Sequence, residues 1–214
     1  MRGYPVHGVI DLLAIIEAAG WPIWPIIAAS IVALGIIGER AWSLRTSAVA
    51  PPALLQTTVQ EFRANGVTQE LLDRVAAGSA LGVVFAAGLR NIGSTREIMK
   101  ESIEEAGRGA ARELDRFLTT LGTIATMAPL LGLLGTIIGL IEIFGSQGQS
   151  GMANPAQLAH GIAIALYNAA FGIIVAVPSL IFYRHFRDRV ESLTVEMELQ
   201  AVKLVEVLRG DRQG

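Results

Sequence analysis

The amino-acid sequence predicts an all-α membrane protein with three transmembrane helices, of which the second and third extend into a cytoplasmic helical region. Hydrophobic residues make up 52% of the 214 residues and charged residues only 17%, as is typical of a membrane protein with a soluble part. Between Phe117 and Tyr183 the only formal charge is that of Glu142. Because charged side chains are costly inside a bilayer, this uneven distribution indicates where the chain crosses it.

The N-terminal part of the chain predicts one surface helix and one span. Residues 1–20 place apolar side chains on one helical face, which predicts an amphipathic periplasmic helix on the outer leaflet. Residues 21–42, "WPIWPIIAASIVALGIIGERAW", have the length that a span of ~20 residues requires. Tryptophan residues at both ends of this run would form an aromatic belt at the two membrane interfaces.

The second and third spans are predicted at residues 117–144 and 156–183, joined by an uncharged periplasmic turn at 145–155. Both runs exceed the ~20 residues that a span needs. Pro129 and Pro178 lie inside them and are expected to kink the helices. The alternative, a buried core helix of a soluble protein, is disfavoured by three such runs and by the partition of the charges.

The remaining residues form the predicted cytoplasmic region, 43–116, and a C-terminal helix, 184–214. No proline interrupts the approach to the second span, so a single helix is expected from about Thr95 to Phe144. Upstream of it we expect short helices joined at Pro52, Gly66, Gly78 and Gly82.

Arginine residues flank the spans on one side only, and they fix the predicted orientation. They follow the first span, precede the second and follow the third, at Arg40, Arg45, Arg112, Arg116, Arg184, Arg187 and Arg189. Positively charged residues are enriched in cytoplasmic segments. We therefore expect the C-terminus in the cytoplasm and the N-terminus and the 145–155 turn outside, which means in the periplasm if the cell has two membranes.

Small residues recur in the second and third spans at the spacing of one helical face. They are Gly132, Gly135 and Gly139 in the second span and Gly161, Ala165, Ala169 and Gly172 in the third. Such stripes let helix backbones approach closely, so the two spans should pack against each other and against copies of the chain. From the spacing alone, this packing is at least as good an explanation as a specialised function.

Several classes of protein are excluded or disfavoured. The chain has no cysteine, and its three histidines are far apart, so neither a disulfide nor a histidine metal site is expected. The sequence contains no nucleophile–base pattern or phosphate-binding loop, which predicts that the protein is not an enzyme and has no cofactor. A net charge of −2 does not suggest binding to nucleic acid.

The chain contains the three stretches "APLLGLLGTIIGLIEIF", "GIAIALYNAAFGIIVAVPSLIFYRHF" and "AAGWPIWPIIAASIVALGIIGERAWSLR". These stretches resemble the spans of the ExbB/TolQ/MotA proton-channel family. The length and the three spans favour the ExbB/TolQ branch. The resemblance implies a homopentamer in the bacterial cytoplasmic (inner) membrane, in contact with membrane lipids, whose second and third spans line a lumen. An ExbD/TolR-type single-span partner in that lumen would carry the proton-binding aspartate, and a TonB/TolA-type protein is a further possible partner.

The resemblance also assigns roles to single residues. The family's second-span threonine is present as Thr136, which could face a partner carboxylate or bond to its own Gly132 carbonyl. The third-span glutamate and threonine of the family are replaced here by Ile164 and Ala169. These replacements put in doubt any proton path that needs a carboxylate of the channel subunit on this span.

Asn168 is the candidate substitute, because it lies one helical turn after Ile164 on the same face. Its amide could bind the partner's aspartate or an ordered water, or could make an interhelical hydrogen bond within or between subunits. The neighbouring Tyr167 could contribute a hydroxyl group. Glu142 could mark the proton entrance, alone or paired with His160, or could be a solvated residue at the interface.

The resemblance therefore implies a subunit of an energy-transducing motor that uses the proton motive force to power transport or envelope processes at the outer membrane. The alternative is a structural membrane scaffold that holds a partner and conducts no ions. The replacements at Ile164 and Ala169 keep this alternative open.

Overall fold

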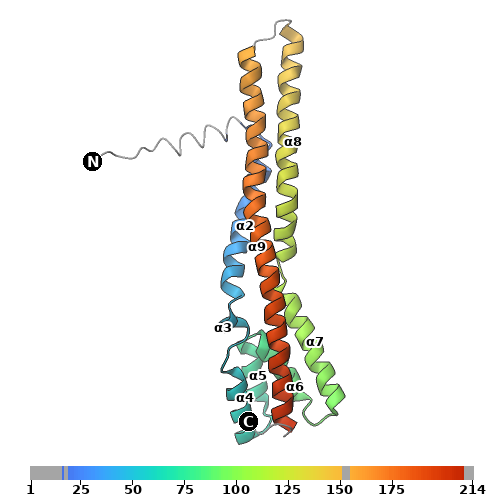
Figure 1. The fold of residues 1–214 in the computed structure, drawn as a ribbon. Coiled ribbons are helices and arrows are strands. Elements are labelled where there is room, and N and C mark those ends of the chain that lie inside the picture. Colours follow the sequence, from blue (N-terminus) through green and yellow to red (C-terminus); the bar gives the residue numbers. More distant parts are fainter. Residues whose placement is uncertain (1–15, 17–18, 151–154, 210–214) are drawn as a thin grey trace, which may run out of the picture. The chain divides into compact units, whose positions relative to one another are not determined.

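A computed structural model describes Ile16 and residues 19–150 and 155–209, in which every regular element is an α-helix. The predicted helix on residues 1–20 falls almost wholly outside this range. Three helices are long and apolar enough to cross a membrane (Figure 1). The predicted class, an all-α membrane protein with three spanning helices, is confirmed.

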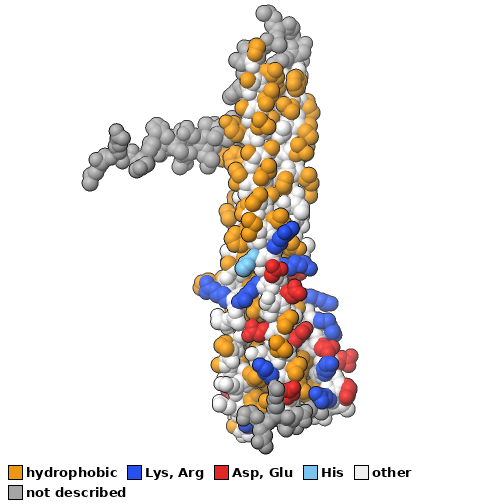
Figure 2. All heavy atoms as spheres, viewed as in Figure 1, with side chains coloured by type: hydrophobic (Ala, Val, Ile, Leu, Met, Phe, Trp, Pro, Cys, Tyr) orange, Lys and Arg blue, Asp and Glu red, His pale blue; other side chains and the backbone are white. Residues whose placement is uncertain are grey.

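The chain divides into two compact units. The transmembrane unit consists of Met1–Ile37 and Thr119–Tyr183, and the charged unit consists of Gly38–Leu118 and Arg184–Gly214. On the face shown in Figure 2, apolar side chains cover the first of these, and the lysine, arginine, aspartate and glutamate side chains gather on the second. The division of contacts thus follows the division of charge in the sequence.

Helix α2 covers Ile23–Ser43, in the region of the first predicted span. A turn precedes it, in which Gly20 adopts a φ of +74°, a conformation that glycine tolerates without strain. Pro22 and Pro25 lie next to the helix start, where a missing N–H group leaves no intrahelical bond unmade.

Helix α8 covers Leu118–Ser150 and helix α9 covers Pro155–Arg209. α8 thus continues beyond the predicted end of the second span and into the segment predicted as a turn. α9 extends the third span without a break, as predicted, because its apolar residues keep a helical period and no glycine follows Gly172 until position 210.

The expectation of one unbroken helix from Thr95 to Phe144 is wrong. Helix α7 covers Arg96–Leu114, and α8 starts at Leu118 after a break in which Phe117 has a φ of 64°. A left-handed residue ends the helical hydrogen-bond ladder, and it is uncommon for a bulky side chain. The sequence carries neither glycine nor proline at this position to announce the break.

Four short helices precede α7 in the charged unit: α3 at Thr46–Val49, α4 at Leu54–Asn65, α5 at Gln69–Gly78 and α6 at Ala80–Arg90. Gly66 ends α4 with a φ of +71°. Gly82 does not separate two helices, contrary to expectation. It lies inside α6, where any Cβ atom would clash with the carbonyl group of Val75.

Side-chain caps explain where several of these helices begin. Thr68, Ser79 and Thr95 accept hydrogen bonds from the backbone N–H groups of Leu71, Gly82 and Ile98, at 3.2, 3.1 and 3.4 Å. Threonine and serine are favoured at this position because their oxygen satisfies an otherwise unpaired N–H group of the first turn.

Candidate functional site

Glycine residues bring the backbones of α8 and α9 into direct contact in the transmembrane unit. A Cβ atom on Gly132 would lie 2.7 Å from the carbonyl oxygen of Asn168, and one on Gly172 would lie 2.6 Å from the carbonyl oxygen of Ala128. Because the opposing atoms belong to the backbone, no side-chain rotation could relieve such a clash. Only glycine permits this approach of the two helices.

The same contact continues along both helices. A Cβ atom on Gly135 would lie 2.8 Å from the Cβ and Cγ atoms of Asn168, and one on Gly139 would lie 3.3 Å from the Cβ atom of Ala165. Asn168 and Ala165 are each only 1% exposed. The small residues of α8 therefore form a shallow trough that holds the Asn168 and Ala165 side chains.

Thr136 connects the two helices through its hydroxyl group. Its Oγ1 lies 3.1 Å from the carbonyl oxygen of Gly132 in its own helix and 2.9 Å from the carbonyl oxygen of Ala165 in α9. A hydroxyl group has a single hydrogen to donate, so the two carbonyl oxygens share it. The back-bond that the sequence leaves open is present, and it occurs together with a bridge to α9.

Asn168 is hydrogen-bonded to the turn that precedes α2. Its Nδ2 donates a hydrogen bond of 3.0 Å to the carbonyl oxygen of Ala19, which lies 149 positions earlier. The Oδ1 atom of the same side chain is buried and has no hydrogen-bond partner among the described residues. The amide nitrogen thus makes a hydrogen bond within the chain, and the amide oxygen is an acceptor without a partner among the described residues.

The turn from Ala19 to Pro22 covers this part of α8 and α9, and the sequence does not reveal that role. A cavity of about 60 Å³ lies there, lined by Ala19, Gly20, Trp21, Pro22, Gly135, Ile138, Gly139, Glu142 and Asn168. The positive φ of Gly20 shapes the turn. The only signal in the sequence is a glycine directly before a Trp-Pro pair.

Comparison with protein families identifies the group to which this chain is related. The MotA/TolQ/ExbB proton channel family matches residues 76–199, more than half of the chain. The chain belongs to this family. The match covers α8, most of α9 and the preceding α6 and α7, so it includes the trough and Thr136. Comparison with curated proteins finds no match.

Membership in the MotA/TolQ/ExbB proton channel family gives the transmembrane unit a context. The family is one of channels and not of enzymes. Within the described ranges no group of three or more histidine, cysteine, aspartate or glutamate side chains is placed to hold a metal ion. Thr136, Asn168 and Glu142 are the predicted pathway residues that lie at the α8–α9 contact or line the cavity beside it.

The structure places the other predicted site residues in surroundings that differ from one another. Tyr167 is 40% exposed on α9, whereas the neighbouring Asn168 is buried in the trough. Ala169 is half-buried against α8, and Gly161 lies under the side chain of Ile143. The side chain of Ile164 lies outside the described residues, so its packing role stays a prediction.

Glu142 is exposed and lines the cavity, one turn beyond Gly139 on α8. The side chain of His160 lies outside the described part, and the predicted Glu142–His160 pair therefore stays a prediction. Pro129 and Pro178 lie inside α8 and α9, which both continue past them.

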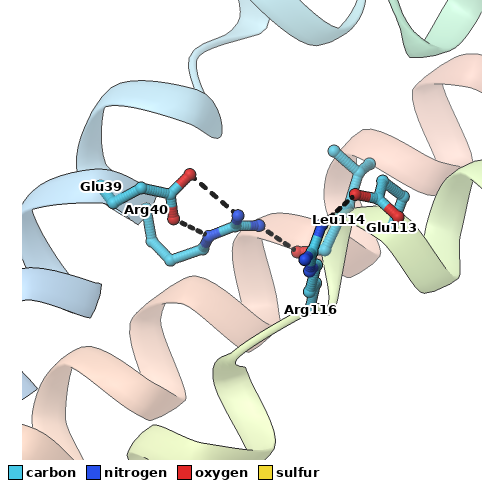
Figure 3. A network of polar contacts seen from close by, with 5 residues as sticks. All are labelled: Glu39, Arg40, Glu113, Leu114 and Arg116. Atoms are coloured by element: carbon cyan, nitrogen blue, oxygen red, sulfur yellow. Dashed lines mark hydrogen bonds and ion pairs between the residues drawn. The ribbon is translucent and has the colours of Figure 1, made fainter. Parts of the chain in front are cut away.

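A second polar cluster lies in the charged unit and gives Arg40 a role that the sequence does not reveal (Figure 3). Arg40 is 7% exposed and donates a hydrogen bond of 3.1 Å from Nη1 to the carbonyl oxygen of Leu114, at the end of α7. It also pairs with the neighbouring Glu39. The guanidinium groups of Arg40 and Arg116 lie 5.5 and 4.7 Å from the ring centroid of Phe117.

This arrangement explains how the break before α8 is held. The last carbonyl groups of a helix lack intrahelical partners, and a cation near them is favourable. Arg40 supplies both the donor and the charge at Leu114, and its contact with the Phe117 ring adds a cation–π attraction. An arginine directly after an apolar run is the only signal for this in the sequence.

Proposed function

We propose that this chain is an inner-membrane proton-channel subunit of an ExbB/TolQ-type motor. In this proposal it uses the proton motive force to power transport or envelope processes at the outer membrane. The observation that carries the proposal is the family membership of a segment that contains the glycine-lined contact between α8 and α9. Three apolar helices and the uneven distribution of charge support a place in the membrane.

The exposed surface of the transmembrane unit supports an assembly of several chains. Large apolar side chains are exposed along α8 and α9, at Met127, Leu130, Leu133, Leu134, Ile137, Ile141, Phe144, Leu166, Ile173, Ile174, Val177 and Ile181. Lipid tails or other helices have to cover such a surface. We propose that part of it is covered by copies of the chain in a homopentamer and by a single-span ExbD/TolR-type partner in the lumen.

The scarcity of titratable groups in the second and third predicted spans, which hold Glu142, His160 and two tyrosines, supports the same partner. Glu142 is the only formally charged residue between Phe117 and Tyr183, and Ile164 and Ala169 replace the polar residues expected from the resemblance. An amide or a hydroxyl group does not titrate in the range in which a proton carrier must. A partner aspartate is therefore proposed as the proton-binding group, and a TonB/TolA-type protein as the element that receives the energy.

A scaffold that conducts no ions is the second candidate function. It is favoured by the hydrogen bond between Asn168 and Ala19, because this bond uses one of the two Asn168 amide hydrogens for packing within the chain. Proton flux into liposomes, with and without a co-expressed single-span partner, separates the two functions. Flux that depends on the partner's aspartate supports the channel, and no flux with an assembled partner supports the scaffold.

We expect Thr136→Val to lower the partner-dependent proton flux about fivefold. The substitution keeps the side-chain shape and removes the hydroxyl group that bridges α8 and α9, a loss of about 1 kcal/mol if the bond strengthens in the rate-limiting step. Thr126→Val is the matched control, because the exposed Thr126 hydroxyl bonds only to carbonyl groups of its own helix. Equal flux from wild type and Thr136→Val would remove this hydroxyl from the proton pathway.

The proposed orientation is testable by labelling, since the chain contains no cysteine of its own. In cells with a permeabilised outer membrane, Ser150→Cys should react with a membrane-impermeant maleimide. Lys100→Cys should react only after the inner membrane is opened. The positive-inside rule gives this expectation, and the opposite labelling pattern would reverse the orientation.

A further inference from the structure

Asn168 carries an acceptor for which the described residues provide no donor. Its side chain is 1% exposed, and its Oδ1 makes no hydrogen bond among the described residues, although its Nδ2 is well bonded to Ala19. A buried amide oxygen without a partner costs free energy, and the great majority of such groups in native proteins bind protein or ordered water. The identity of the two amide atoms follows from the bond to Ala19, because only the nitrogen can donate to a carbonyl group.

The cavity beside Asn168 has the size and the polarity to supply the missing donor. Its volume of about 60 Å³ exceeds the ~10–15 Å³ that one water molecule requires. Gly135 lines the cavity, and Oδ1 of Asn168 lies 3.2 Å from the point where a Cβ atom on Gly135 would stand. The absence of a side chain at Gly135 therefore leaves room next to the unpaired oxygen.

We propose that this cavity is a water-binding site, in which ordered water donates a hydrogen bond to Oδ1 of Asn168. Asn168 and Glu142 are the lining residues with an amide or carboxylate oxygen in the side chain. A metal ion would need more oxygen ligands than these two side chains supply. Water, in contrast, is satisfied by two to four polar partners, which the amide oxygen, the carboxylate and the backbone of the turn provide.

The site has a consequence for proton entry that rests on the proposed channel function. Glu142 is exposed and lines the same cavity as the buried Asn168. Water in the cavity would extend hydration from the Glu142 carboxylate toward Asn168. A proton would pass along it by hopping, in which each water accepts a proton on one side and releases another on the far side. Asn168 would orient the water and would not itself change protonation state.

The site is tested by water-edited solid-state NMR on the full chain in lipid bilayers, with ¹³C and ¹⁵N asparagine. The pair Tyr167–Asn168 is the only Tyr-Asn pair in the sequence, so selective labelling of tyrosine and asparagine assigns the Asn168 signal. The exposed Asn65 is the wet reference, and the methyl group of Ala128, 1% exposed, is the dry reference.

We expect polarisation from water to reach the Asn168 side-chain carbonyl within twofold of the rate for Asn65. A rate as slow as that of the Ala128 methyl group would overturn the water site. The measurement needs no proton flux. A dry cavity in a conducting protein would thus reject the water site alone, and a wet cavity in a protein without flux would reject the channel alone.

Two variants show whether the water depends on the Asn168 oxygen. Asn168→Leu has a similar volume and no acceptor, so water transfer to the Cα of Gly139, which lines the cavity, should fall to the rate of the dry reference. Ser179→Ala is the matched control, because Ser179 is also a buried polar residue of α9 but bonds only to Val175 of its own helix. Unchanged water transfer to Gly139 in Asn168→Leu would overturn the role of Oδ1. If this variant does not fold, the wild-type measurement still decides on the site.

Discussion

Gly172→Val is expected to destabilise the transmembrane unit strongly, by forcing helices α8 and α9 apart. A Cβ atom at this position would lie 2.6 Å from the backbone oxygen of Ala128 and 3.1 Å from the Cα atom of Gly132. Helices α8 and α9 would have to separate, at a cost of about 3 kcal/mol, the upper end of the usual range for overpacking. In detergent the melting temperature should fall by about 6–12 °C.

Gly35→Val provides the matched control for this experiment. Gly35 lies in the apolar part of α2, and no atom lies within 4 Å of its Cβ position. Its replacement should change the free energy of unfolding by less than about 0.5 kcal/mol, as is usual for open surface positions. Equal melting temperatures for the two variants would show that α8 and α9 do not meet at Gly172.

Arg40→Met is expected to destabilise the charged unit by about 2–4 kcal/mol, and to do so at the break between α7 and α8. The substitution keeps an apolar stem of similar length but removes the donor to the Leu114 carbonyl and one of the two cations over the Phe117 ring. The nearby Glu39 loses its partner at little cost, because its side chain is 49% exposed and water can solvate it.

Hydrogen exchange locates this effect. The backbone N–H of Leu118 donates to the carbonyl oxygen of Asp115, and the N–H of Asp115 donates to that of Ala111. In Arg40→Met both amides should exchange faster than in the wild type. Arg45→Met is the control, because Arg45 is exposed and only stacks on Trp42, a contact of about 0.5–1 kcal/mol. Similar exchange in the two variants would mean that Arg40 does not hold the break.

Much of the fold could be predicted from the sequence because its strongest signals are physical constraints on whole segments. Burial in a bilayer excludes charges from a span, and the run from Phe117 to Tyr183 shows this directly. Close helix packing requires small residues at fixed spacing, and Gly132 and Gly172 occur in such stripes. Both rules can be applied to a sequence alone, because they depend only on the local composition and on the spacing of residues along a helix.

The remaining features depend on contacts between distant parts of the chain. The hydrogen bond from Asn168 to Ala19 joins positions 149 residues apart, and no local pattern indicates it. The break at Phe117 was not expected, since left-handed backbone is usually marked by glycine or asparagine and here is held by Arg40 and Arg116. Gly82 looks like a helix junction in the sequence, but its role is to admit the Val75 carbonyl group.

The glycine-lined contact between α8 and α9 also has an entropic and mechanical consequence. Glycine and alanine have no side-chain rotamers to lose on burial, so this contact forms without the conformational penalty of larger side chains. The rotatable side chains at this contact, Asn168 and Thr136, are each fixed by a hydrogen bond, so they cannot rearrange freely to absorb a displacement. The paired helices should therefore move under force as one rigid unit. A conformational change of the transmembrane unit should cost the least free energy at its exposed faces, where large side chains can shift against a neighbouring molecule.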